Sequence, residues 1–274
     1  VMDMAKNAFA GLSTKAPFTV DTHDKIAPTL TITDDKTSAT NSAILYTFTA
    51  SEAIKDFTTD DITVTGGTKG EFKTISATSY TLSVTPDVNS ITPVTVDVAA
   101  GKFTDLVGNP NNLATAINTQ AVDTVAPTVT ITDDKTGVTS SPILYTFTLS
   151  EESNTFTIDD ITVTGGTKAA TLTTVSPTEY QVSVTPNTNS TTPVTVDVVA
   201  GKFTDAAGNS NLAATQNSQE VDTAAPTIKI EDNQAGLATG GTIIYTFTLS
   251  EASNNFTLDD ITVTGGTKAA TLTA

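Results

Sequence analysis

Carboxylate and amide side chains recur along this chain at a fixed spacing. Asn109 follows Asp105 by four residues, and Asn209 follows Asp205 by the same interval. Calcium takes oxygen ligands of these kinds from flexible loops. The chain has one histidine and no cysteine, the residue types on which zinc and copper sites depend. The residues therefore indicate a hard cation, and calcium is favoured over magnesium, whose geometry is stricter.

These residues belong to a block of about a hundred residues that recurs along the chain. Ala27, in the sequence Ala-Pro-Thr, returns as Ala126 and Ala225, a step of 99 residues each time (126 − 27 and 225 − 126). Such a period has to be found before the fold is assigned. We expect a fragment of a longer array, divided into the tail of an earlier repeat (1–22), two full repeats (23–124 and 125–223) and the front half of a further one (224–274).

The composition excludes several partners. A net charge of −17 and an isoelectric point near 4.1 argue against nucleic acid and against an anionic membrane surface, since both are polyanions. Only 16% of the residues are charged, and Val, Ile, Thr, Tyr and Phe recur in alternating runs, unlike the composition of acidic disordered chains. We expect a folded protein that does not insert into a membrane.

Alternating apolar residues predict short β-strands separated by turns. Runs with a period of two include Ile44-x-Tyr46-x-Phe48 and Val94-x-Val96-x-Val98, and a full repeat contains roughly seven such strands without a helical period. This pattern predicts an all-β fold of tandem antiparallel β-sandwiches, like those of immunoglobulin or fibronectin type III domains. Another sandwich topology would give the same alternation. The tyrosines at Tyr46, Tyr145 and Tyr245 fall on the inward positions, so we expect them to be buried.

The antiparallel order places the acidic loops at the two ends of each sandwich. If repeats stack head to tail, carboxylates from both ends converge at each junction. Two carboxylates about 4 Å apart repel by about 4 kcal/mol at an effective dielectric near 20, and calcium would relieve this repulsion. The candidate ligands are Asp21, Asp34, Asp35, Glu52, Asp105, Asn109, Asp123, Asp133, Asp134, Glu151, Asp205, Asn209 and Asp222.

Two further acidic pairs have two interpretations of equal weight. Asp60-Asp61 and Asp159-Asp160 either cap turns through bonds to the local backbone or add ligands to a cation site.

The residues resemble the bacterial immunoglobulin-like repeats of very large secreted adhesins, of the RTX type that type I secretion exports. The resemblance covers essentially the whole chain and rests on three runs, 122–128, 143–166 and 200–209. It implies β-sandwiches strung in many copies at the outer surface of a bacterium. It also implies calcium at or near the domain junctions, with Asp123, Asp205 and Asn209 as ligands and Asp133 and Asp134 facing the following repeat.

Three functions are compatible with these features. The favoured one is a structural extender that calcium stiffens at its junctions, whose partners are the neighbouring repeats and which reaches a host receptor only through other domains. A module for glycans or ice is the first alternative, although the chain has no tryptophan and few tyrosines. A spacer within a secreted multidomain enzyme is the second. We do not expect this segment itself to be an enzyme, because most catalytic triads need histidine or cysteine.

Overall fold

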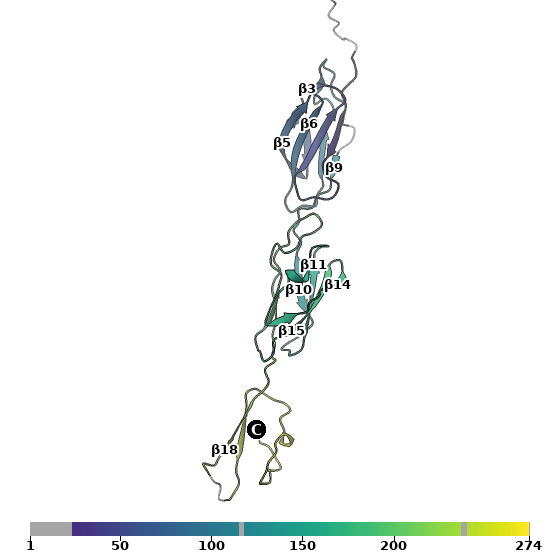
Figure 1. The fold of residues 1–274 in the computed structure, drawn as a ribbon. Helices are drawn as coiled ribbons and strands as arrows, with labels where there is room; N and C mark the ends of the chain where they lie inside the picture. Colours follow the sequence, from purple (N-terminus) through teal and green to yellow (C-terminus); the bar gives the residue numbers. More distant parts are fainter. Residues whose placement is uncertain (1–23, 115–117, 237–239, 274) are drawn as a thin grey trace, which may run out of the picture. The chain divides into compact units, whose positions relative to one another are not determined.

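The computed structural model describes residues 24–114, 118–236 and 240–273, and most of its regular structure is β-strand (Figure 1). The helical segments are 3-10 turns of three residues each, η1 (Thr59–Asp61), η2 (Ile158–Asp160) and η3 (Leu258–Asp260). None of the helical segments in these ranges has the length or the apolar character needed to cross a membrane.

The first repeat is an antiparallel β-sandwich. One sheet has the strand order β1-β2-β6-β5, the other has the order β4-β7-β9, and β3 and β8 form a short ladder of their own. The strands are β1 (Leu30–Asp34), β2 (Ile44–Ala50), β3 (Ile54–Lys55), β4 (Ile62–Thr65), β5 (Gly67–Ser76), β6 (Ser79–Pro86), β7 (Val94–Val98), β8 (Thr104–Asp105) and β9 (Asn118–Gln120).

The second repeat has the same architecture. Its sheets follow the orders β10-β11-β15-β13, with β14 also pairing with β15, and β12-β16-β17. The strands are β10 (Val129–Asp133), β11 (Ile143–Leu149), β12 (Thr162–Thr164), β13 (Gly166–Lys168), β14 (Thr173–Ser176), β15 (Glu179–Pro186), β16 (Val194–Asp197) and β17 (Asn217–Gln219). The predicted all-β fold of tandem antiparallel sandwiches is confirmed.

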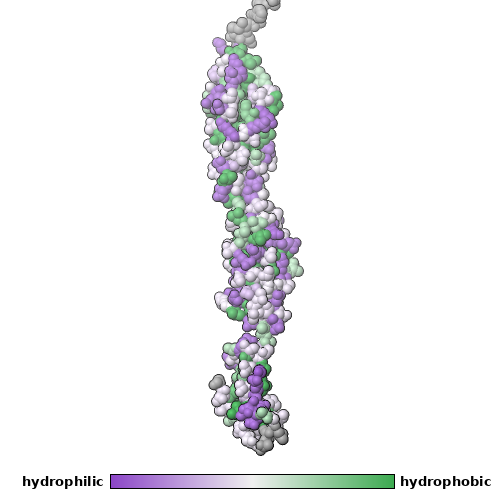
Figure 2. Space-filling model, turned by 90° about the vertical axis from the view of Figure 1, so that its left-hand side faces the viewer, coloured by the Kyte–Doolittle hydropathy of each residue, from purple (hydrophilic) through white to green (hydrophobic). Residues whose placement is uncertain are grey.

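Alternation along the strands places apolar side chains between the two sheets of each sandwich. In β2, Ile44, Tyr46 and Phe48 are fully buried, whereas the intervening Thr47 and Thr49 lie on the outer face, because successive residues of a strand point to opposite sides. On the face drawn in Figure 2, hydrophilic and near-neutral residues cover most of the surface and apolar residues are scattered among them. The apolar residues thus form the core and the threonines form the outer faces.

An aromatic cluster fixes the end of the first repeat from which the acidic loops project. The ring of Phe57 makes edge contacts, at centroid distances of 5.0 to 5.7 Å, with Phe48, Phe72, Tyr80 and Phe103. Each such contact contributes about 0.5–1.5 kcal/mol beyond the burial of area. Phe103 immediately precedes β8, so the cluster anchors the strand that ends in Asp105.

The double glycine that follows β4 and β12 is required by a close approach of the backbone. Gly165 has a φ of +71°, and a Cβ at this position would lie 2.2 Å from the carbonyl oxygen of Pro193. Gly66 has a φ of +73°, and its Cβ would lie 2.4 Å from the carbonyl oxygen of Pro93. A left-handed position without room for a side chain admits only glycine.

The 3-10 turns are capped locally. In η1 the Asp61 carboxylate accepts hydrogen bonds from the backbone N–H (2.8 Å) and the hydroxyl (2.9 Å) of Thr58. Of the two interpretations of the acidic pairs, capping is therefore the role observed for Asp61. A lysine ten residues further on donates from Nζ to a carbonyl of each turn, and these pairs are Lys69–Thr59, Lys168–Ile158 and Lys268–Leu258.

The third copy, residues 224–273, forms only part of a sandwich. Its strands β18 (Ile228–Asp232) and β19 (Tyr245–Leu249) pair in the register that the first repeat uses for β1 and β2. Tyr245 is 48% exposed, whereas its counterpart Tyr145 is fully buried. The expectation that all three tyrosines are buried is wrong for Tyr245, because the described sheet of the third copy consists of β18 and β19, without a strand that covers Tyr245 as β15 covers Tyr145.

The Tyr145 hydroxyl shows whether a buried polar group can lack a hydrogen bond in this core. It has no hydrogen-bond partner among the described residues, and burial, followed by the charges of Asp133 and Asp134, raises the pKa of this side chain to about 12. A buried hydroxyl without a partner costs about 1–3 kcal/mol. We therefore expect Tyr145→Phe to leave the free energy of unfolding unchanged or to raise it, as measured by urea denaturation.

The matched control is Tyr180→Phe, because the Tyr180 hydroxyl donates to the Pro177 carbonyl oxygen at 3.2 Å. Losing that bond should lower stability by about 0.5–1.5 kcal/mol. A larger loss at Tyr145 than at Tyr180 would show that the Tyr145 hydroxyl is satisfied in solution.

Candidate metal centre

Three carboxylates meet at one end of the first repeat. Asp24 precedes β1, Glu52 lies between β2 and β3, and Asp105 is the last residue of β8. Each offers an oxygen, and the three oxygens all lie within 4.8 Å of one another. Asp105 is buried, with 1% of its surface exposed, while the other two are half-buried. We call this group the first acidic cluster.

The second repeat builds the same group. Asp123 and Glu151 lie 99 residues after Asp24 and Glu52 (123 − 24 and 151 − 52), and together with Asp205 they form the second acidic cluster, again with oxygens within 4.8 Å of one another. Because both groups consist of the same residue types on equivalent elements, the sandwich itself brings them together.

The loop after β8 holds Asp105 in its ionised form. One carboxylate oxygen, Oδ1, accepts the backbone N–H groups of Val107 (3.0 Å), Gly108 (2.6 Å) and Asn109 (2.8 Å). Burial raises the pKa of Asp105, but the Asn109 side chain and these N–H groups outweigh burial and lower it overall. The Asp-x-x-Gly-Asn segment therefore forms a loop whose backbone N–H groups bind the carboxylate of its own first residue.

Asn109 and Asn209 connect the parts of each cluster. The Asn109 amide nitrogen donates to Asp105 Oδ2 at 2.6 Å and to the Asp24 carbonyl oxygen at 3.2 Å. The Asn209 amide nitrogen donates to Asp205 Oδ2 at 2.7 Å and to the Asp123 carbonyl oxygen at 2.9 Å. Both amides were predicted as metal ligands, and the structure gives them a positioning role between two carboxylate-bearing segments.

In each cluster, the glutamate is the carboxyl group whose pKa is raised. Burial, then the charges of Asp24 and Asp105, raise the pKa of Glu52. Burial, then the charges of Asp123 and Asp205, raise the pKa of Glu151. Among the described residues, the lysine ion pairs involve other carboxylates, namely Asp35, Glu71, Asp134 and Glu231. Each cluster therefore concentrates negative charge without a lysine ion pair in the described part of the chain.

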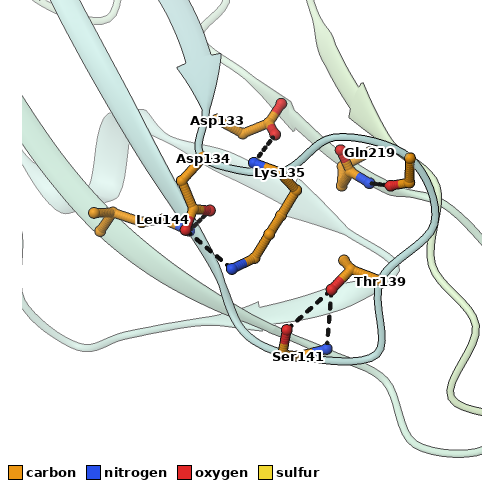
Figure 3. Close-up of polar contacts among 8 residues, drawn as sticks. Asp133, Asp134, Lys135, Thr139, Ser141, Leu144 and Gln219 are labelled. Atoms are coloured by element: carbon orange, nitrogen blue, oxygen red, sulfur yellow. Dashed lines mark hydrogen bonds and ion pairs between the residues drawn. The ribbon is translucent and has the colours of Figure 1, made fainter.

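The acidic turns at the opposite end of the sandwich are neutralised locally (Figure 3). Asp133 Oδ1 accepts the Lys135 backbone N–H at 2.9 Å, and Asp134 Oδ2 pairs with Lys135 Nζ at 3.0 Å. The backbone N–H of Leu144, followed by Lys135, lowers the pKa of Asp134. Asp34 and Asp35 make the equivalent contacts in the first repeat. Neither acidic cluster includes these four predicted ligands.

Two other predicted ligands, Asp21 and Asp222, belong to neither acidic cluster. Asp21 lies outside the described residues, and the position that completes the first acidic cluster is Asp24. The signal for Asp24 was available in the 99-residue step, since 123 − 99 gives 24. Asp222 corresponds to Asp123 and caps its own turn by accepting the Ala224 N–H at 3.0 Å. No group of three carboxylates forms around it within the described ranges.

The two antiparallel β-sandwiches that follow one another along the chain define a class of tandem immunoglobulin-like domains. The chain matches the family described as "Bacterial Ig-like domain" over residues 24–122, 123–221 and 222–273, and it belongs to that family. In this frame each domain begins with an equivalent aspartate: Asp24, Asp123 or Asp222.

Comparison with solved structures finds domains 5-6 of the S-layer protein SbsC. They are similar to this chain at 15% sequence identity, over 71% of this chain and 98% of the other, with a TM-score of 0.22. No curated protein sequence matches the chain.

The raised pKa values of Glu52 and Glu151 predict how stability depends on pH in chelator. A carboxyl whose folded pKa exceeds its unfolded pKa binds protons more tightly in the folded state. The folded state is therefore favoured at low pH, and the melting temperature should fall as pH rises from the ordinary glutamate range through the raised folded pKa. Differential scanning calorimetry of the Glu52→Gln, Glu151→Gln double variant should show a smaller fall.

The variant Asp60→Asn is the control for this measurement, because Asp60 is exposed and belongs to neither acidic cluster. If the melting temperatures of the double glutamate variant and the wild type depend on pH in the same way, the raised pKa values of Glu52 and Glu151 are contradicted.

Proposed function

We propose that this chain is a structural spacer, a segment of an extracellular bacterial surface protein that separates its attachment point from domains elsewhere. One observation carries the proposal: the fold, the acidic cluster and the loops recur together from one repeat to the next. A repeated unit suits a role that adds length, because each repeat contacts only its neighbours and further copies extend the array.

Calcium at the two acidic clusters is the second part of the proposal. The donor set fits this ion, since each cluster offers three carboxylates from separate loops and calcium accepts carboxylates together with water in a flexible shell. Asp105 and Asp205 would supply preorganised oxygens, while Glu52 and Glu151 would be relieved of repulsion. Asp24 and Asp123 stand at the start of their domains, so the ion would tie each domain to the segment that leads into it.

The glycan alternative has less support. Sugar sites commonly use exposed aromatic rings, but in the two complete repeats Tyr46, Tyr80, Tyr145 and Tyr180 are all buried, and only Tyr245 of the partial third copy is half-exposed. Binding to a glycan array by the full chain would favour this alternative over the spacer.

Calcium titration tests the ion. Free calcium at ten times the dissociation constant should add about 1.4 kcal/mol of stability per site, which thermal melting would detect. We expect Glu151→Gln to weaken binding at the second cluster by about tenfold, equivalent to about 1.4 kcal/mol, as measured by isothermal titration calorimetry.

The matched control is Asp159→Asn, because Asp159 is an exposed carboxylate of the same repeat that belongs to neither cluster. Unchanged melting in chelator and in calcium would exclude the proposed sites, while leaving the spacer role to be judged by ligand screening.

A further inference from the structure

The residue that opens the second domain is bonded to both complete repeats. The Asp123 backbone N–H donates to the Thr40 carbonyl oxygen of the first repeat at 3.1 Å. The Asp123 carbonyl oxygen accepts the Asn209 amide of the second repeat at 2.9 Å. Its carboxylate belongs to the second acidic cluster with Glu151 and Asp205.

The next residue, Thr124, is fastened to the first repeat by its hydroxyl. Thr124 Oγ1 donates to the Asp87 carbonyl oxygen at 2.7 Å and accepts the Ser90 backbone N–H at 2.8 Å. The Thr124 backbone N–H donates to the Ser90 carbonyl oxygen at 3.0 Å. We call these three bonds the Thr124 clamp. They hold the linker against a turn in which Asn89 has a left-handed φ of +53°.

The clamp recurs at the second junction. Thr223 Oγ1 donates to the Asn187 carbonyl oxygen at 2.6 Å and accepts the Ser190 N–H at 2.9 Å, and Asn189 has a φ of +54°. Residue 87 is an aspartate where residue 187 is an asparagine. The side chain at this position is not needed, because the threonine hydroxyl binds the backbone carbonyl. Threonine is common to these two junctions, whereas Lys25 occupies the equivalent position of the first repeat.

A hydroxyl that both donates and accepts is well suited to fix a linker. It satisfies one carbonyl and one N–H of the turn at once, and both groups would otherwise need other partners. Valine has the same shape as threonine but can make neither bond. Serine keeps both bonds and loses only a methyl group.

We propose that Thr124 is a positioning residue that couples the second acidic cluster to the preceding repeat, and that Thr223 fixes the segment that leads into the third copy in the same way. This inference rests on the proposed spacer function. Asp123 and Thr124 are adjacent in the chain, so an ion bound by the Asp123 carboxylate acts on a segment that Thr124 holds on the first repeat. Without the hydroxyl, the linker would keep only its backbone bonds to Thr40 and Ser90, so the ion would order the second repeat and the junction would be held more loosely.

The test measures the distance between the two complete repeats by electron spin resonance. The chain has no cysteine, so labels can be placed at Thr31→Cys and Thr130→Cys, which are exposed and equivalent positions on β1 and β10. The labelled full chain is compared with the same chain carrying Thr124→Val, in calcium and in chelator. We expect calcium to narrow the distance distribution of the wild type and to leave that of Thr124→Val broad.

Calorimetry of the same samples separates coupling from binding, since Thr124→Val should bind calcium at the second cluster as tightly as the wild type. Thr124→Ser should restore the narrow distribution. Thr63→Val, an equivalent change on the exposed face of β4, should have no effect. A narrow distribution for Thr124→Val with calcium bound would overturn the proposal.

Absence of calcium binding in the wild type would contradict the proposed ion and not the clamp. The distance distributions of the wild type and Thr124→Val in chelator then decide whether the clamp holds the linker. A broader distribution for Thr124→Val than for the wild type would support the clamp, and equal widths would overturn it.

Discussion

Electrostatic repulsion among three carboxylates is the constraint on which the site depends. The apolar core decides the fold, and the fold then places Asp24, Glu52 and Asp105 within 4.8 Å of one another. The protein meets part of this cost internally, because the loop after β8 directs three backbone N–H groups and one amide at Asp105. The remaining cost falls on Glu52, whose pKa is raised by burial and then by the charges of Asp24 and Asp105. One carboxylate is thus preorganised by the backbone, and another is left as the group that gains most from a cation.

Most of the fold could be predicted from the sequence, because alternation and turn residues are local signals. The inward positions of β2 and β11 follow from a period of two, and the glycine pair follows from a left-handed turn. The exposure of Tyr245 could not be predicted from this alternation. The five-residue sequence of β19 also forms part of β11, yet Tyr145 is buried and Tyr245 is half-exposed. Burial depends on strands distant in the sequence, which no local pattern contains.

The site was predicted in outline and not in detail. Residue type and spacing identified Glu52, Asp105, Asp123, Glu151 and Asp205, which the structure brings together in two groups. The same signals predicted Asp133 and Asp134, yet Asp134 pairs with the Lys135 ammonium group and Asp133 accepts the Lys135 backbone N–H. Asp24 was not among the predicted ligands, although it lies 99 residues before Asp123. A carboxylate either points into a cluster or caps its own turn, depending on the direction of its side chain. No short motif in this sequence encodes that direction.

The lysine bonds to the 3-10 turns have a consequence for how such a chain assembles. Neighbouring copies share identical stretches, such as residues 62–69, 161–168 and 261–268, and similar neighbours can exchange strands while they fold. The bond between Lys268 and the Leu258 carbonyl oxygen is present in the third copy, whose described sheet has only the two strands β18 and β19. This contact therefore does not require a completed sandwich. Each copy carries a short-range interaction that favours pairing within itself, which would reduce the entanglement of adjacent copies during synthesis.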